Sequence, residues 1–399
     1  MLVVTLLALV AGALVYQVLT VVAAMRYRGV RPSRLGVAPA ISILKPLAGA
    51  EEGLEANLRS FFEQRYPAFE ILFAVRSGAD PAIPVVEGLQ ARYPNVPSRL
   101  IVTGEPPYAN AKVYSLDLML EAASHDLVVM ADSDIRVTPG MLSSLAAEFA
   151  DEKLGMATCP YRVVPGRSFW SMLEAVGLNT EFLAGVLVAR MLDGMKFALG
   201  PTIAARRETL RRIGGFDAVK DYLAEDFVLG RLAAEHGFGV ILSSYVIDHY
   251  IGAQSFGANL RHRLRWSRSA RRSRPWGYWG QIFTHALPPA MLLCAISPAW
   301  WPVLACTVVL RAAAVWATAG HVLRDPLTRR QWWLVPLQDM IDLLVWCAGF
   351  FGNTILWRGR RYWLLPDGRF EPVEEPARTA ASTSALSLSR WRTRPDPRS

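Results

Sequence analysis

Residues 126–134 read Asp-Leu-Val-Val-Met-Ala-Asp-Ser-Asp, a short apolar run that ends in two carboxylates. An uninterrupted apolar run of this length predicts a buried strand of a parallel sheet. Asp132 and Asp134 would then stand beyond the carboxyl end of that strand, where open α/β sheets bind ligands. Two carboxylates so close together suit a divalent cation, Mg²⁺ or Mn²⁺, that keeps positions open for substrate phosphates. The alternative is a plain turn in which Asp132 caps a helix near Pro139.

Apolar runs on both sides of this stretch alternate between strand-like and helix-like patterns. The predicted strands cover residues 41–45, 70–75, 98–102, 126–131 and 155–159, and the predicted helices cover residues 53–64, 83–93 and 111–123. Such alternation is typical of a largely parallel sheet that is covered by helices. We therefore expect residues 37–275 to form one α/β domain.

Other polar residues lie at the ends of these predicted elements. Asp80 follows the strand that ends at residue 75, although it also suits the N-cap of the next helix. Asn110 and Lys112 begin a helix, where amides and an ammonium group can meet phosphate oxygens. The pair Glu225-Asp226 opens another helix, where acids often only complement the helix dipole. Each of these signals is ordinary when taken alone.

The composition indicates a membrane protein. Of 399 residues, 52% are hydrophobic and only 19% are charged, and the mean hydropathy is +0.22. Residues 2–24 carry no charge and are long enough to cross a bilayer, and Arg26, Arg28, Arg31 and Arg34 follow. These arginines predict a cytoplasmic catalytic domain after an N-terminal anchor at residues 1–25. A cleaved signal peptide is disfavoured because no basic segment precedes the apolar run.

Further membrane segments are expected at residues 281–357. Residues 284–323 can cross twice and residues 332–356 a third time, with Asp339 and Asp342 on one helix face directed into a bundle or cavity. The number of crossings stays open, because three would place the tail outside. The apolar stretch 169–199 suits core packing, in part beside a lipid entry. Residues 379–399 have the composition of a disordered basic tail.

A basic run, Arg261-His262-Arg263-Leu264-Arg265-Trp266, precedes the C-terminal apolar region. It suits the solvated or lipid-facing side of an amphipathic helix. The net charge of +9 also admits nucleic acid. We do not expect nucleic-acid binding, because only one stretch is basic and aromatic and a membrane segment follows it closely.

In combination these motifs resemble the ceramide glucosyltransferase family, glycosyltransferase family 21, in its bacterial members. The matching stretches, in chain order, are Ser42-Ile43-Leu44-Lys45-Pro46-Leu47, Asp80-Pro81-Ala82-Ile83, Asp132-Ser133-Asp134, Ile213-Gly214-Gly215-Phe216, Leu223-Ala224-Glu225-Asp226 and His262-Arg263-Leu264-Arg265-Trp266. One departure is His262, where the family usually has Gln or Arg. Hopanoid-lipid glycosyltransferases look similar in this region.

The resemblance implies a GT-A (Rossmann-like) domain between an N-terminal transmembrane helix and C-terminal membrane segments. It also implies a nucleotide-sugar site. Asp134 would hold Mg²⁺ or Mn²⁺, and Asp132 would lie near the ribose or the metal. Asp80 would hold the uridine, while Lys45 and Lys112 would support donor binding.

The resemblance further implies an inverting transfer to a lipid. Asp226 would be the general base. Arg265, with His262, would bind the pyrophosphate or fix the acceptor, and Trp266 would form a stacking wall. The expected reaction moves a sugar, glucose first, from a UDP-sugar to ceramide or a hopanoid lipid at the cytoplasmic face of a bacterial cell membrane.

Other activities remain open at this point. A hopanoid-lipid N-acetylglucosaminyltransferase differs only in a pocket shape that motifs do not encode. A processive polysaccharide synthase shares the acids and the Arg-Trp pair, but the predicted membrane part is small for a polymer channel. A binding or scaffold protein with a vestigial site is disfavoured, because every acid that the chemistry requires is present.

Overall fold

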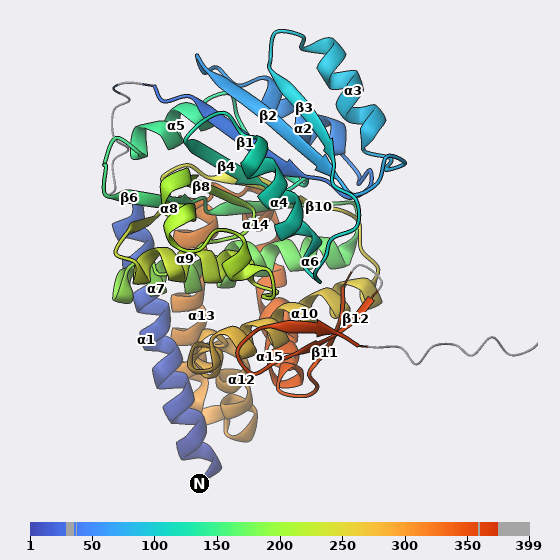
Figure 1. The fold of residues 1–399 in the computed structure, drawn as a ribbon. Coiled ribbons are helices and arrows are strands. Elements are labelled where there is room, and N and C mark those ends of the chain that lie inside the picture. The colour runs from blue at the N-terminus through green and yellow to red at the C-terminus, as the bar shows by residue number, and fades with distance from the viewer. Residues whose placement is uncertain (29–35, 37, 358–359, 374–399) are drawn as a thin grey trace, which may run out of the picture.

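The computed structural model describes residues 1–28, 36, 38–357 and 360–373. A sheet covered by helices forms one part of the molecule, and a group of apolar helices extends from one side of it (Figure 1). Arg31, Arg34 and the predicted tail at 379–399 lie outside the described residues.

The main sheet has seven strands in the order β3-β2-β1-β4-β8-β6-β9. These strands are β1 (Ile41–Pro46), β2 (Phe69–Val75), β3 (Ser98–Val102), β4 (Leu127–Ala131), β6 (Leu154–Thr158), β8 (Thr202–Arg206) and β9 (Gly239–Leu242). The five predicted strands are confirmed to within one residue at each end. The sheet is mixed, however, because β8 runs antiparallel to both β4 and β6. The sequence Thr-Ile-Ala-Ala-Arg of β8 is short and rich in small residues, so its pattern did not predict a strand.

Helices cover both faces of this sheet. They are α2 (Leu54–Phe62), α3 (Ile83–Arg92), α4 (Ala111–Ala122), α5 (Met141–Glu148), α8 (Arg207–Arg212) and α9 (Glu225–Glu235), with the 3₁₀ turn η2 (Asp217–Val219) before α9. Side chains of β1 alternate between the two layers: Ile41 and Ile43 pack with one hydrophobic cluster, and Leu44 packs with the other. Burial on both faces explains why the strands are apolar throughout.

A second sheet, in the order β5-β10-β7, lies beside the carboxyl end of β4. Its strands are β5 (Ile135–Arg136), β7 (Tyr161–Pro165) and β10 (Ile247–Ile251). Strand β10 pairs antiparallel with β5, and His249 is opposite Ile135. This pairing brings residues more than 100 positions apart to the end of β4.

Among the described residues, three helical segments are long and apolar enough to cross a membrane. They are Leu2–Arg28 (α1), Phe169–Asp193 and Pro298–Val322. The second comprises α6 (Phe169–Gly177), the π-helix η1 (Leu178–Phe182) and α7 (Leu183–Asp193), and it passes beneath the main sheet (Figure 1). Within its most apolar window 67% of the residues are buried, in accord with the predicted core packing.

The C-terminal apolar region is divided into several helices, and the number of crossings stays open. The remaining elements are α10 (Phe256–Ser273), α11 (Pro275–Gly280), η3 (Gln281–Thr284), α12 (Leu287–Ile296), η4 (Pro298–Trp300), α13 (Trp301–Val315), η5 (Trp316–Val322), α14 (Pro326–Gln331), η6 (Trp332–Leu334) and α15 (Val335–Gly349). Helix α12 has only ten residues, too few to span a bilayer alone. The predicted segment 332–356 is also not one helix, since α15 ends at Gly349. A small sheet of β11 (Thr354–Trp357), β12 (Arg360–Leu364) and β13 (Phe370–Pro372) follows.

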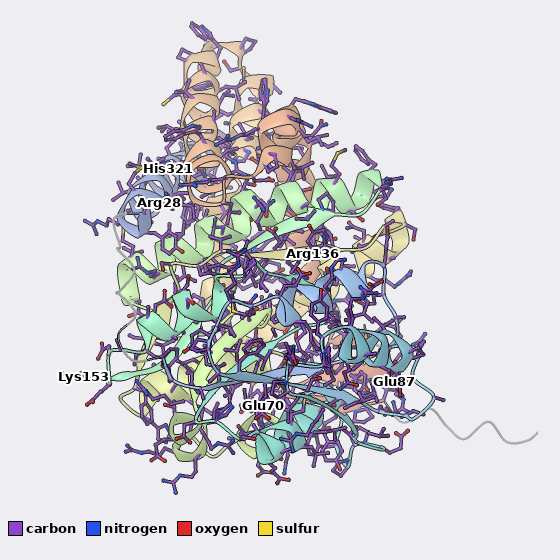
Figure 2. All side chains as sticks on the ribbon, turned by 90° about the horizontal axis from the view of Figure 1, so that it is seen from above. Arg28, Glu70, Glu87, Arg136, Lys153 and His321 are labelled. Atoms are coloured by element: carbon purple, nitrogen blue, oxygen red, sulfur yellow. The ribbon has the colours of Figure 1, made fainter. Side chains whose placement is uncertain are left out.

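The C-terminal end of α1 lies beside the helix Pro298–Val322. Helix α1 contacts η5, and Arg28 and His321 lie on the same side of the molecule in Figure 2. Arg26 and Arg28 occupy the last turn of α1. Basic residues at the end of an apolar helix are typical of a membrane boundary.

Inside the helix group, Arg311 and Asp339 form a bidentate ion pair. Arg311 Nε and Nη2 lie 2.9 and 2.7 Å from the two carboxylate oxygens, and both residues are at least 97% buried. Asp342, one turn further, pairs with Arg263 at 3.3 Å. The prediction that both acids point inward is confirmed.

We predict that Arg311→Met destabilises the protein by about 3–5 kcal/mol, because it leaves the Asp339 carboxylate buried without its partner. The double variant Arg311→Met/Asp339→Leu should recover most of that loss, since no buried charge remains. Chemical unfolding of the detergent-solubilised protein measures both. Equal losses in the single and double variants would show that the ion pair, rather than the orphaned charge, sets the stability.

Candidate active site

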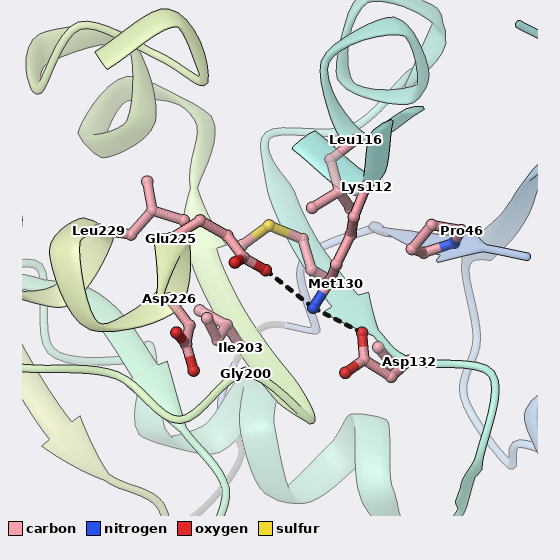
Figure 3. Close-up of a pocket in the computed structure, with 11 residues that line it drawn as sticks. Pro46, Lys112, Leu116, Met130, Asp132, Gly200, Ile203, Glu225, Asp226 and Leu229 are labelled. Carbon is pink, nitrogen blue, oxygen red and sulfur yellow. Dashed lines mark ion pairs between the residues drawn. The ribbon is translucent and has the colours of Figure 1, made fainter. Parts of the chain in front are cut away.

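The predicted donor and acid residues gather at the carboxyl ends of β1, β2 and β4. A small pocket lies between the end of β4 and the start of α9 (Figure 3). Its lining includes Pro46, Lys112, Asp132, Glu225 and Asp226. Chain segments around residues 46, 112, 132 and 225 thus form one site, as the position of the acids after β4 predicts.

Lys112 joins the two acidic motifs. Its Nζ lies 2.7 Å from Asp132 Oδ1 and 3.1 Å from Glu225 Oε1 (Figure 3). Burial favours loss of the proton, but these carboxylates outweigh it and raise the pKa of Lys112 well above its usual range. Asn110 caps this helix by accepting from the Val113 N–H, and its amide donates to the Tyr222 carbonyl. Lys112 is therefore a fixed cation within the pocket.

Lys45 lies beneath this pocket and is absent from its lining. The side chain is fully buried, Nζ donates to the Asp132 carbonyl, and it stands 3.9 Å from the centre of the Phe61 ring. Burial lowers the pKa of Lys45 to about 7. The geometry makes Lys45 a support for the loop that carries the two aspartates.

Asp80 also organises backbone at this edge of the sheet. Its Oδ1 accepts from the N–H groups of Gly49 at 3.0 Å and Ala82 at 2.9 Å. The carboxylate thus ties the turn after β2 to the loop after β1. The capping interpretation is correct in part, because one of these bonds is to the start of α3.

Asp134 faces His249 instead of Lys112. The distance from Asp134 Oδ2 to His249 Nε2 is 3.0 Å, while Asp134 Oδ1 and His249 Nδ1 are buried and have no hydrogen-bond partner among the described residues. Burial opposes ionisation of Asp134, but His249 outweighs it and lowers the carboxyl pKa. Burial likewise opposes protonation of His249, and Asp134 raises its pKa on balance.

The unpartnered carboxylate oxygen and imidazole nitrogen would suit a divalent cation such as Mn²⁺ once the imidazole has lost its proton. Among the described residues, no three His, Cys, Asp or Glu side chains gather around one point. Phosphate oxygens or water would have to complete the coordination. Asp132, the other expected ligand, is engaged by Lys112.

Sequence reasoning missed His249. The only signal was a histidine beside Asp248 in a short strand pattern, and nothing in that pattern indicates its neighbour. The antiparallel pairing of β10 with β5 supplies the missing information.

Asp226 opens α9 and faces the same pocket, beside Gly200 (Figure 3). The backbone N–H groups of Phe227 and Gly200 donate to its carboxylate. A Cβ atom at Gly200 would lie 2.8 Å from Asp226 Oδ2, so this contact requires glycine. Burial and the neighbouring Glu225 raise the pKa of Asp226 to about 6, near the value that suits a general base at neutral pH.

Aromatic side chains connect Asp134 and His249 to α10. The Tyr161 ring lies 5.4 Å from both His249 and Phe182, and Phe182 lies 6.1 Å from Trp266. The Tyr161 hydroxyl is buried without a hydrogen-bond partner. Trp266 is thus placed next to the apolar helix 169–193, as a stacking wall requires.

His262 and Arg265 are directed differently. His262 Nδ1 lies 2.7 Å from Oε1 of the buried Glu174 on α6. Arg265 lines a second hollow, between α10 and the strands β11 and β12, and is not among the residues that line the Lys112 pocket. The structure therefore places His262 and Trp266 against α6 and η1 but does not bring Arg265 to the donor pocket.

A mixed sheet covered by helices, with acids at the end of β4 and at the start of α9, is the architecture of the GT-A fold. A mannosyltransferase from Pyrobaculum calidifontis, solved with GDP-Man and Mn²⁺, superimposes with a TM-score of 0.53 at 19% identity and covers 88% of this chain and 99% of that one. The sequence model of glycosyltransferase family 21 matches residues 3–370, and the chain therefore belongs to this family.

Two relatives come from Caenorhabditis elegans. Ceramide glucosyltransferase 1 is 31% identical over 209 residues, which are 52% of this chain and 44% of that relative. Ceramide glucosyltransferase 3 is 24% identical over 343 residues, 84% of this chain and 74% of the relative. The chain thus spans less than half the length of the first relative.

We predict that Asp134→Ala and His249→Ala each weaken Mn²⁺ binding by at least about tenfold and leave the fold intact, because each removes a donor from a polar crevice. The free-ion EPR signal measures binding in the presence of UDP. Asp193→Ala, which removes an exposed carboxylate elsewhere, is the control. Unchanged Mn²⁺ affinity in both site variants would contradict the metal assignment.

Proposed function

We propose that this protein is an inverting glycosyltransferase that moves a sugar, glucose first among candidates, from a UDP-sugar to a lipid such as ceramide. The observation that carries the proposal is the position of Asp226, a carboxylate of raised pKa in the same pocket as the cation Lys112. The relatives named ceramide glucosyltransferase support both the sugar and the acceptor. We place the catalytic domain at the cytoplasmic face of a bacterial cell membrane, in accord with the basic end of α1.

The proposed reaction is a single displacement. Asp226 accepts the proton of the acceptor hydroxyl while that oxygen bonds to the anomeric carbon. The bond from this carbon to the β-phosphate oxygen breaks, and UDP leaves with the electron pair. No second catalytic acid is required, because the diphosphate is already a good leaving group.

We propose that the Lys112 ammonium group helps to stabilise the departing diphosphate. Lys112 supplies a fixed ammonium group between Asp132 and Glu225. A divalent cation held by Asp134 and His249 would add Lewis-acid stabilisation of the phosphate oxygens. Asp80 is proposed to hold the uridine, and Asp132 to lie near the ribose.

The acceptor side is proposed to lie toward α6 and η1. Trp266 and Phe182 provide an apolar wall next to Tyr161. Glu174 orients His262 toward this side. We propose that Arg265 contacts the pyrophosphate or the acceptor only after α10 shifts toward the donor pocket.

Mass spectrometry of the lipid product tests the proposed function. The purified protein is given a mixed pool of nucleotide sugars with ceramide and a hopanoid lipid as competing acceptors. A hexosyl ceramide is the expected product. An N-acetylhexosaminyl hopanoid would replace both substrates, a polymer would indicate a processive synthase, and the absence of any product would reject the enzyme assignment.

We predict that Asp226→Asn lowers the transfer rate by roughly 10²-fold or more, because the amide cannot accept the acceptor proton. Donor affinity should change little. Glu225→Gln is the matched control, since Glu225 contacts Lys112 and would alter donor binding more than proton transfer. If Asp226 only complements the helix dipole, Asn would leave turnover nearly normal and cost about 1 kcal/mol of stability or less.

The transfer rate should also depend on pH through Asp226. The base works only when it is unprotonated, so the rate should fall about tenfold per pH unit below its pKa of about 6 and level off above it. A series of kcat values at saturating substrate concentrations, from about pH 4.5 to about pH 8, measures this acidic limb. An acidic limb that persists unchanged in Asp226→Asn would assign it to another group.

A further inference from the structure

A second hollow of the protein lies away from the Lys112 pocket. It is a groove of about 480 Å³ between α10 and the strands β11 and β12. The lining consists of Arg261, Leu264, Arg265, Arg268, Thr354, Ile355, Leu356, Arg361, Trp363 and Val373. A volume of this size is typical of small-ligand sites.

The groove is strongly basic. Four arginines line it, and none of the described lining residues is acidic. Arg261 and Arg361 are exposed, so their guanidinium groups are accessible. Arg268 holds the two walls together, because its Nε donates to the Phe351 carbonyl at 3.0 Å and its Nη1 to the Thr354 carbonyl at 2.7 Å. Guanidinium groups in such a number are the usual protein partners of phosphate.

Strand alternation separates this groove from the donor motifs. Thr354 is opposite Trp363 and Leu356 is opposite Arg361, so these four side chains share the face that lines the groove. Ile355 is opposite Tyr362, and Tyr362 packs on the other face against Leu223 near the Glu225-Asp226 motif.

The rim of the groove is apolar and exposed. Leu356 and Trp363, within the lining, are 47% and 49% exposed, and Phe351, whose carbonyl binds Arg268, is 73% exposed. Both walls continue directly into the apolar helices. Helix α10 leads through α11 to α12, and four residues connect the end of α15 to the start of β11 at Thr354. Exposed aromatic and aliphatic side chains beside apolar helices are typical of the membrane interface.

We propose that this groove binds the phosphate headgroup of an anionic phospholipid, with Arg261, Arg268 and Arg361 around the phosphate and Trp363 and Leu356 against the glycerol and first acyl carbons. Exposed arginines beside exposed apolar side chains match that amphipathic ligand, which is both anionic and apolar. The groove is separate from the Lys112 pocket, and Arg265 is its one lining residue that also has a proposed role in sugar transfer. Through the shared strands, a bound lipid would hold β11 and β12 against Leu223.

Native mass spectrometry of the full-length protein in a neutral detergent tests this proposal. Equal amounts of phosphatidylglycerol and phosphatidylcholine are offered, and the retained lipids are counted. Wild type should retain phosphatidylglycerol in preference. Arg261→Gln/Arg361→Gln should weaken its binding roughly 30-fold, as expected from two phosphate-facing arginines near a membrane. Arg65→Gln/Arg211→Gln removes the same charge from exposed positions on the catalytic domain and should bind as wild type.

The remaining outcomes overturn the proposal in distinct ways. No lipid preference in wild type, or equal losses in both double variants, would leave only a general electrostatic attraction. Displacement of the lipid by millimolar inorganic phosphate or UDP would assign the groove to a soluble phosphate. Arg361→Lys keeps the charge and should retain most of the binding. If it loses lipid as fully as Arg361→Gln, the effect is a structural lesion and not charge recognition.

Discussion

The ion pairs of Lys112 hold the site together. One ammonium group contacts Asp132, at the end of β4, and Glu225, at the start of α9. These two acids come from distant segments of the chain and would repel one another in a buried pocket. An unpaired buried carboxylate costs several kcal/mol. Lys112 removes that cost and so permits Asp226, the next residue along, to stand in the same pocket without a cation of its own.

The acids of the site have different protonation behaviour. Asp134 faces His249, which lowers the carboxyl pKa and keeps oxygen lone pairs ready for a metal. Asp226 has burial and Glu225 beside it, which raise its pKa to about 6. Carboxylates whose environments separate their pKa values commonly divide roles at a catalytic site. Here one suits metal binding and the other suits proton abstraction.

The sequence was informative where function lies next to a strong local pattern. The apolar run 127–131 predicted β4 and the position of Asp132, and the charge-free residues 2–24 predicted α1. Long-range pairing was not readable: His249 reaches Asp134 only because β10 pairs with β5. Residues 354–357 were expected to be membrane helix, because apolar strand residues next to an apolar helix share its composition. The groove that Arg265 lines depends on that unforeseen strand.

The proposed reaction is one displacement at the anomeric carbon by an acceptor that Asp226 deprotonates. The most direct test is the proton NMR spectrum of the glycolipid made from an α-linked UDP-sugar. A single displacement inverts the configuration, so the anomeric proton of the product should show the large coupling of a β-linked sugar. An α-linked product would require either two displacements or a front-side reaction, and it would contradict the assignment of Asp226 as the only catalytic base.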